Sequence, residues 1–346
     1  MGDKAKYHHL IPQTYISAWG NISGTISYKE LKTGMCGKKN KDNILGINHY
    51  HSIIAGMPIC TEDDVKEIFA ILKDYNVEYQ GKVITDLMQI NQIYYDFENW
   101  NITRKSDGTI ASKKPIKSAI DQVKIRDIET LWSTKYENHW PEVRTEIEKR
   151  VLKASGEIEE FQKDFLMKFY VSIDWRSSAT DPLFAKEFKR LSTDILQMDQ
   201  VEIPKDERGL PFFETMADYF EHCLLLMTFR RFLHDKGTMC VQVEASEKNT
   251  NFHFLIADGK SRFITSDNPS FICLREDGLK VGLMPITPRI LMAQGKSGNS
   301  DNVYYVTHIT EEAVERYNKK IEENALLNIT VRQSRQSGVA RATCPD

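Results

Sequence analysis

The chain has 346 residues, of which 41% are hydrophobic and 27% are charged. This length and composition predict a soluble globular protein with a sizeable apolar core. The formal net charge of −3 and the isoelectric point near 6.3 argue against a surface built wholly to attract nucleic acid. They leave room for local basic patches.

The six cysteines are widely spaced and form no CxxC pair, which argues against a zinc ribbon and against a disulfide framework. We therefore expect reduced thiols and a cytoplasmic protein. The N-terminus lacks an apolar signal stretch, and no segment approaches the run of about 20 apolar residues that a membrane-spanning helix needs. No membrane partner is expected.

Two blocks of different hydrophobic periodicity open the chain. Residues 1–60 contain short alternating runs, such as 24–31, and are expected to form a β-containing entry segment. Residues 61–236 are expected to be mainly helical, because Thr61 and the acidic residues after it provide a helix N-terminus. Apolar residues recur at helical spacing in 128–151, 157–173, 181–196 and 211–233, whereas 101–114 is expected to be an exposed loop or ragged hairpin.

The third block, residues 237–330, changes to the periodicity of strands. Turn signals such as Asp258-Gly259 separate short apolar runs and predict an antiparallel sheet with tight turns. A final helix is expected at 310–327, and residues 331–346 are expected to be a flexible tail. The strands are expected at 239–243, 251–256, 262–265 and 279–283. The order of blocks predicts an α+β fold in which residues 1–330 form a single large domain.

The most distinctive local pattern is the pair His8-His9, followed by Pro12. Histidine is the commonest metal ligand and the side chain whose charge changes near neutral pH. The pair therefore predicts a metal or proton-transfer site, with His8 as a metal ligand and His8 or His9 as the group that activates water. The alternative is one buried, hydrogen-bonded imidazole beside one exposed imidazole.

A second polar cluster is Ser266-Asp267-Asn268-Pro269. Serine and aspartate can close a local turn through their own side chains, and the proline favours an extended residue before it. The other interpretation places Asp267 and Asn268 at the end of a strand, facing His8 and His9. Together these residues would form an oxygen and nitrogen ligand set suited to Mn, Mg or Zn.

Two further candidates lie in the helical middle. Glu137 is predicted to be a general base or metal ligand, with a solvated surface carboxylate as the alternative. Arg176 ends an apolar helix and is predicted to hold a carboxylate or phosphate, or else to form a buried structural ion pair. The adjacent Glu221 and His222 diverge by about 100° on a helix and cannot chelate a metal jointly.

Two segments of the chain, HHLIPQTYISAW at 8–19 and RFITSDNPS at 262–270, are distinctive. They resemble the opening motif HHxxPxxYLxxF and the motif FITSDNPV of a prokaryotic family of unknown function, DUF4238. The segment PITP at 285–288 resembles its PLSP element, and Glu137 and Arg176 fall where the family tends to carry an acidic and a basic residue. The resemblance implies a site but no established activity.

The N-terminal motif also resembles the start of HNH nucleases, in which one residue binds a divalent metal and the next activates water. Asn43 and either His49 or His51 would then supply the asparagine and the final histidine of that pattern. The chain lacks the zinc-knuckle cysteines and the Gly-Gly pair that often accompany it. Residues 13–16 look helical, which also argues against an HNH fold.

The first function class is a divalent-metal-dependent nuclease or phosphoesterase. In it His8 or His9 activates water, Asp267 and Glu137 hold the metal, and Arg176 neutralises phosphate. The expected cofactor is Mn, Mg or Zn, and the expected substrate is nucleic acid or another phosphate-containing compound. Such uncharacterised domains often serve in bacterial defence or as toxins. No Walker loop, GxGxxG, GxSxG or HExxH motif is present, so no nucleotide cofactor is expected.

The second function class is a non-catalytic sensor or protein-interaction module with a protein partner. In this interpretation the polar motifs join the N-terminal segment to the C-terminal sheet. His8, His9, Ser266 and Asp267 would then form an interdomain hydrogen-bond network.

Overall fold

The computed structural model describes residues 6–177, 189–274, 278–296, 303–326 and 329–332. The chain divides into two compact units, each made of segments that are not consecutive. The first unit comprises residues 1–48, 132–185 and 235–346, and the second comprises 49–131 and 186–234. The α+β class is confirmed, and the expected single domain stays a prediction.

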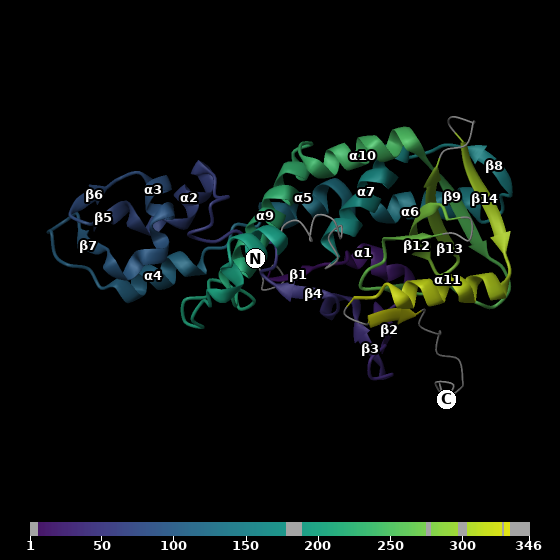
Figure 1. Cartoon of the computed structure of the whole chain (residues 1–346), viewed down its shortest axis with the longest axis horizontal. Helices are drawn as coiled ribbons and strands as arrows, with labels where there is room; N and C mark the ends of the chain where they lie inside the picture. The colour runs from purple at the N-terminus through teal and green to yellow at the C-terminus, as the bar shows by residue number, and fades with distance from the viewer. Residues whose placement is uncertain (1–5, 178–188, 275–277, 297–302, 327–328, 333–346) are drawn as a thin grey trace. The chain divides into compact units, whose positions relative to one another are not determined.

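The largest sheet of the first unit has six strands (Figure 1). Its neighbours are antiparallel, except that β14 runs parallel to β9. The expected antiparallel sheet is therefore mixed. The cause is that β13 and β14 run in opposite directions on the two sides of β9. In spatial order the strands are β11 (Phe271–Leu274), β12 (Lys280–Thr287), β13 (Ile290–Lys296), β9 (Thr250–Ala257), β14 (Val303–Ile309) and β8 (Gly156–Glu159).

Helix α11 (Glu311–Glu323) covers one face of this sheet. Its residues Val314 and Ile321 belong to an apolar cluster with Leu255 and Leu291 of the strands, and all four are buried. Thr310 caps the helix by accepting a hydrogen bond from the Ala313 backbone at 3.4 Å. The expected final helix is thus confirmed, and it ends at residue 323.

The remaining helices of the first unit pack around the sheet and the N-terminal segment (Figure 1). Large aromatic side chains contribute to the packing between α6 and α7, where Trp140 and Phe169 stack at 3.9 Å between ring centroids. The helices are α1 (Gln13–Ile16), α6 (Trp140–Val151), α7 (Lys163–Arg176) and α10 (Thr238–Asn249), with short 3-10 or π turns at Ser17–Trp19, Lys41–Asn43 and Ser133–Glu137.

Two smaller sheets hold the N-terminal segment. One pairs β1 (Tyr7–His9) with β4 (Gly46–Asn48), and the other has the order β10-β15-β2-β3. These strands confirm the β-containing entry segment. In the second sheet β15 (Ile329–Arg332) lies between β10 (Thr265–Ser266) and β2 (Thr25–Glu30), and β3 (Cys36–Asn40) forms an edge. The expected tail is therefore wrong at residues 331 and 332, because their backbone is paired, while 333–346 lie outside the described residues.

Two sequence expectations fail in the first unit. The expected strand at 239–243 lies inside helix α10, because Met239 and Val243 are one helical turn apart and both are buried. The expected helix at 157–173 begins only at Lys163, since residues 156–159 pair with β14 as strand β8. Residues 239–243 are a short apolar run, for which the helical and strand patterns overlap.

The second unit is mainly helical, as expected for the middle of the chain, and carries one three-stranded sheet. Its strands are β6 (Lys82–Ile84), β5 (Tyr75–Tyr79) and β7 (Asn101–Arg104), in that spatial order. Its helices are α2 (Glu62–Ile68), α3 (Leu87–Gln92), α4 (Lys113–Gln122), α5 (Asp127–Trp132) and α9 (Met216–Leu233), with shorter turns at Ala70–Asp74, Tyr94–Asn99, Arg190–Ile195 and Met198–Gln200.

The helix starts of this unit follow sequence rules. Thr61 begins α2 and Thr215 begins α9, each as part of a reciprocal capping box with the acidic residue three positions later. The expected ragged hairpin at 101–114 is present as β7 and a bridge between Thr103 and Ile110. Of the expected helix at 181–196, residues 181–188 lie outside the described residues. Across the described parts of both units, no helix combines the length and the apolarity needed to cross a membrane.

Candidate functional site

The N-terminal motif places two histidines on strand β1. His8 is buried and its backbone pairs with Ile47, whereas His9 is half-buried. The Gln13 amide donates to His9 Nε2 at 3.1 Å. Pro12 immediately precedes helix α1 and lacks an N–H donor, which suits the start of a helix. The strand therefore positions the two imidazoles, and helix α1 begins a few residues after them.

The two family-like motifs contact each other within the first unit. The Tyr15 hydroxyl donates to the Pro285 carbonyl at 2.6 Å and lies 3.0 Å from Thr265 Oγ1. The Trp19 indole donates to the Phe263 carbonyl at 2.9 Å. Burial raises the pKa of Tyr15 far above its usual range, with the Thr265 hydrogen bond as a smaller opposing effect. Segments about 250 residues apart are thus joined by buried hydrogen bonds.

Arg176, at the end of α7, contacts two of the other predicted site residues. Its guanidinium donates to Glu137 Oε1 at 2.6 Å and to the His9 carbonyl at 2.6 Å. It also lies over the Trp132 ring, 5.0 Å from the centroid. Arg176 is only 2% exposed. The structure therefore brings His9, Glu137 and Arg176 together, with the ion pair that the sequence left as an alternative.

The next residue, Ser177, reaches the Ser-Asp-Asn motif. Its hydroxyl donates to Asn268 Oδ1 at 3.0 Å, and Asn268 Nδ2 donates to the Asn324 carbonyl at 3.0 Å. Asp267 Oδ1 accepts from the Leu326 backbone at 2.9 Å. One oxygen of each predicted metal ligand, Asp267 and Asn268, is thus used within the chain. Their metal roles, and that of His8, stay predictions.

In the second unit, a buried histidine meets a carboxylate. His51 Nδ1 is paired with Glu129 Oε1 of helix α5, 78 positions later in the chain. His51 is fully buried, and its ring lies edge-on to Phe229. A histidine that donates one ring N–H to a carboxylate is held in a fixed tautomer and orientation, as in many metal and catalytic sites. The ligand atoms of His51 and Glu129 lie within 4.8 Å, so these residues could hold a metal ion.

A second buried histidine belongs to the same unit. His222 Nε2 lies 2.7 Å from the Tyr50 carbonyl, and its ring packs edge-on to Tyr50. Burial, with the nearby His51 as a smaller cause, lowers the pKa of His222 to about 3. His222 is therefore neutral at physiological pH and donates to the Tyr50 carbonyl. Glu221, its neighbour, instead accepts a hydrogen bond from Ser192 at 2.6 Å, as expected for side chains that diverge.

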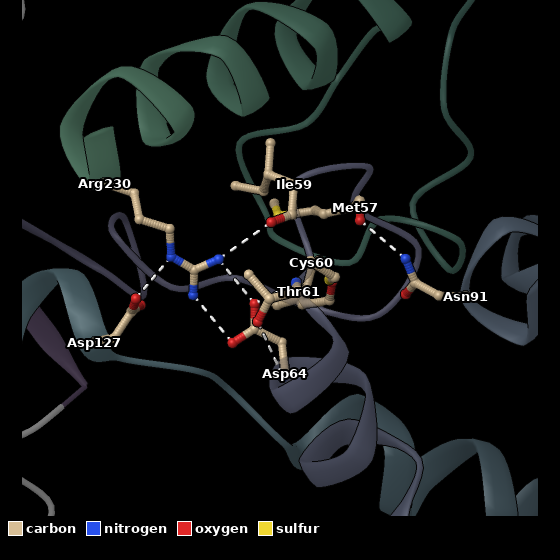
Figure 2. A network of polar contacts seen from close by, with 9 residues as sticks. Met57, Ile59, Cys60, Thr61, Asp64, Asn91, Asp127 and Arg230 are labelled. Atoms are coloured by element: carbon tan, nitrogen blue, oxygen red, sulfur yellow. Dashed lines mark hydrogen bonds and ion pairs between the residues drawn. The ribbon is translucent and has the colours of Figure 1, made fainter. Parts of the chain in front are cut away.

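A half-buried arginine holds the start of helix α5 (Figure 2). Arg230 of α9 donates to Asp127 Oδ2 at 2.7 Å, to both carboxylate oxygens of Asp64 and to the Ile59 carbonyl. Burial alone would raise the pKa of Asp64, but hydrogen bonds from Arg230 and Thr61 hold it below its usual value. Because Asp127 is the first residue of α5, this contact positions Glu129 two residues later.

Sequence reasoning missed most of this second cluster. It proposed His51 only as one of two final histidines in an HNH pattern, and it did not single out Glu129, Asp127 or Arg230. The available signal was the apolar run at 53–57 directly after His51, which predicts that the histidine is buried and needs a partner. Its partner could not be identified, because sequence spacing carries no information about a contact across 78 positions.

The profile of the family described as protein of unknown function (DUF4238) matches residues 7–336, nearly the whole chain. The match agrees with the two motifs at 8–19 and 262–270. No curated protein sequence and no solved structure matches the chain.

Proposed function

Because the chain belongs to the DUF4238 family, whose description assigns no activity, we propose a function from the site's own chemistry: a divalent-metal-dependent hydrolase of phosphate esters. The metal would bind at His51 and Glu129. The observation that carries this proposal is the buried pairing of the His51 imidazole with the Glu129 carboxylate. An imidazole with a carboxylate is a ligand combination used for Zn and Mn.

The surrounding residues support a metal role. Arg230 neutralises Asp64 and holds Asp127, so the start of α5 is fixed independently of any ligand. His222 is neutral, so it adds no positive charge that would repel a cation. A bound divalent ion would lower the pKa of a water molecule and polarise a phosphate oxygen. The residues of the chain then orient the ion and keep its surroundings poorly hydrated.

Metal binding is tested first, on the full chain. Mn²⁺ and Zn²⁺ are titrated by calorimetry into four metal-free proteins: the wild type, His51→Ala, Glu129→Gln and a control. The control is His234→Gln, which changes an exposed histidine of the same unit. We expect the two site variants to weaken binding about tenfold or more, because each removes a ligand. Equal affinity in all four proteins would exclude this site.

Catalysis is tested separately with a phosphodiester, DNA and RNA as substrates. A chelator should remove hydrolysis, and Mn²⁺ or Zn²⁺ should restore it. Activity should fall as the pH is lowered, because protons compete with the cation for its protein ligands. Metal binding without hydrolysis of any of these substrates would leave a metal site and reject the hydrolase.

The sequence-predicted residues enter the same assays. His8→Ala and His9→Ala test the roles in metal binding and water activation that the N-terminal motif predicts, and Glu137→Gln tests the predicted base. Arg176→Lys keeps a positive charge but loses the planar fork that binds phosphate. A full loss of activity with unchanged stability would assign these residues to the reaction.

The hydrogen bonds of Asp267 and Asn268 favour a second candidate function. In a non-catalytic interaction module these residues would tie strand β10 to the end of α7 and to the chain after α11, and leave no role in chemistry. Variants of the motif would then lower the melting temperature, while partner binding or metal binding would be unchanged in the folded fraction.

A further inference from the structure

Ser52 and Arg126 flank an isolated β-bridge in the second unit. Ile53 and Ile125 exchange both backbone hydrogen bonds, each at 3.0 Å, in an antiparallel bridge. In such pairing the residue before one partner faces the residue after the other, and their side chains project from the same side. Ser52 and Arg126 are therefore cross-strand neighbours, directly after His51 and three positions before Glu129.

Both side chains carry a buried polar atom without a partner. Ser52 is fully buried, and neither its Oγ nor the Nε of Arg126 makes a hydrogen bond to any residue that the structure describes. A buried hydroxyl or guanidinium N–H that lacks a partner costs about 1–3 kcal/mol or more, so native proteins rarely keep one without a ligand or water. Two such donors on neighbouring positions indicate that they share an acceptor.

We propose that Ser52 and Arg126 form a subsite for an anionic oxygen of a phosphate group. An oxyanion accepts hydrogen bonds from a hydroxyl and from a guanidinium N–H and compensates the arginine charge. The nearest carboxylate in sequence, Asp127, pairs with Arg230 through Oδ2 at 2.7 Å, and its Oδ1 forms no hydrogen bond to Arg126 or to any other described residue. The inference rests on the proposed function, because it gives the metal site at His51 and Glu129 a substrate group.

The test titrates inorganic phosphate into the metal-free full chain by calorimetry at low ionic strength. We expect one binding site in the wild type, a loss of about tenfold or more in Arg126→Gln, and a smaller loss in Ser52→Ala. Arg104→Gln makes the same change of charge at an exposed arginine of the same unit, and we expect it to bind like the wild type. A short oligonucleotide titrated in parallel distinguishes a nucleic-acid phosphate from free phosphate.

Two results would overturn the subsite. One is that the wild type does not bind phosphate, as expected if a buried water satisfies both donors. The other is that the wild type and Arg126→Gln bind phosphate equally well. If Arg126→Gln does not fold, Arg126→Lys replaces it, since lysine keeps the charge but lacks the Nε–H. Wild-type affinity in that variant would overturn the role of this atom.

Mn²⁺ affinity measured on the same proteins separates this inference from the proposed function. Arg126→Gln should leave Mn²⁺ binding unchanged, while His51→Ala should weaken it. Phosphate binding that persists in a protein without Mn²⁺ affinity would support the subsite and reject the metal-dependent hydrolase. Mn²⁺ binding without phosphate binding would reject the subsite and support the metal site.

Discussion

Two pairs of residues with buried polar atoms, one pair in each unit, differ in their hydrogen bonds. In the first unit, the motif residues Asp267 and Asn268 form hydrogen bonds with the chain itself. In the second unit, Ser52 and Arg126 each keep a buried polar atom with no hydrogen bond to the described residues. Satisfied polar groups stabilise a fold, whereas unsatisfied ones are costly unless a ligand completes them. Asp267 and Asn268 therefore help to hold the first unit together, whereas Ser52 and Arg126, which belong to no motif, are candidates for binding a ligand.

The largest loss of stability should come from the replacement of Arg230. Arg230→Met leaves the carboxylates of Asp64 and Asp127 without their cation and should lower the free energy of unfolding by about 3–5 kcal/mol. Urea unfolding measures the loss, and hydrogen exchange should locate it in residues 49–131 and 186–234. Lys135→Met, which breaks an exposed pair with Asp235 at 3.0 Å, should cost less than about 1 kcal/mol. Similar losses in both variants would contradict a stabilising role of the contacts that Arg230 makes with Asp64 and Asp127.

The next largest loss of stability should come from the replacement of Asn268, which tests whether the Ser-Asp-Asn motif has a structural role. Asn268→Ala removes the bonds to Ser177 and Asn324 and should lower the free energy of unfolding by about 1–3 kcal/mol. Ser177→Ala, which removes only one of them, should cost less. Mn²⁺ affinity should be unchanged in both. A loss of metal binding at nearly full stability would instead confirm the sequence-predicted metal role of Asn268 and remove the contrast between the units.

His222 should make the second unit sensitive to acid. Its pKa is about 3 in the folded chain and about 6.5 when unfolded, so its stabilising contribution is complete above pH 6.5. The contribution decreases as the pH falls through this window, by at most about 1.4 kcal/mol per pH unit. His222→Gln can still donate to the Tyr50 carbonyl and should flatten the dependence between pH 6.5 and 5.5. An unchanged slope in urea unfolding would contradict the assignment.

His308 should make the stability of the first unit depend on pH in the direction opposite to that of His222, and by a smaller amount. It donates to Asp258 and to the Ala154 carbonyl, each at 2.9 Å, and the Asp258 hydrogen bond is the main cause of its raised pKa. Its contribution is complete below pH 6.5 and is lost as the pH rises through the folded pKa. The pair is partly exposed, so less than about 1 kcal/mol is expected. His308→Gln should remove this alkaline loss, as measured by melting temperature from pH 6 to 9.

Local signals in the sequence were sufficient where a contact involves neighbouring residues. Thr61, Thr215 and Thr310 begin helices as capping rules predict, and the alternation of residues 24–31 gives β2. The strand expected at 239–243 is wrong because its apolar residues fit the periods of both a strand and a helix. The burial of Met239 and Val243, one helical turn apart, favours the helix. Strand β15 could not be expected, since its pairing depends on partners about 300 residues away.

The candidate site was predictable only in part. The motifs correctly indicated that the two ends of the chain meet, and Glu137 and Arg176 were found because the family resemblance selected them. Glu129 carries no sequence signal, because a glutamate on a short helix resembles a surface residue until His51 is placed beside it. Buried polar pairing is a property of the folded chain, and periodicity does not encode it.

The order of segments along the chain has a consequence for synthesis on the ribosome. Arg230 is made 166 positions after Asp64 and 103 after Asp127, and strand β15 takes its place between β10 and β2 only near the C-terminus. At about 5–20 residues per second, several seconds pass in which two acidic side chains await their cation and β2 has an open edge. Neither unit can be completed before these late segments have been made, and a ribosome-bound chain stalled before residue 230 should be sensitive to protease.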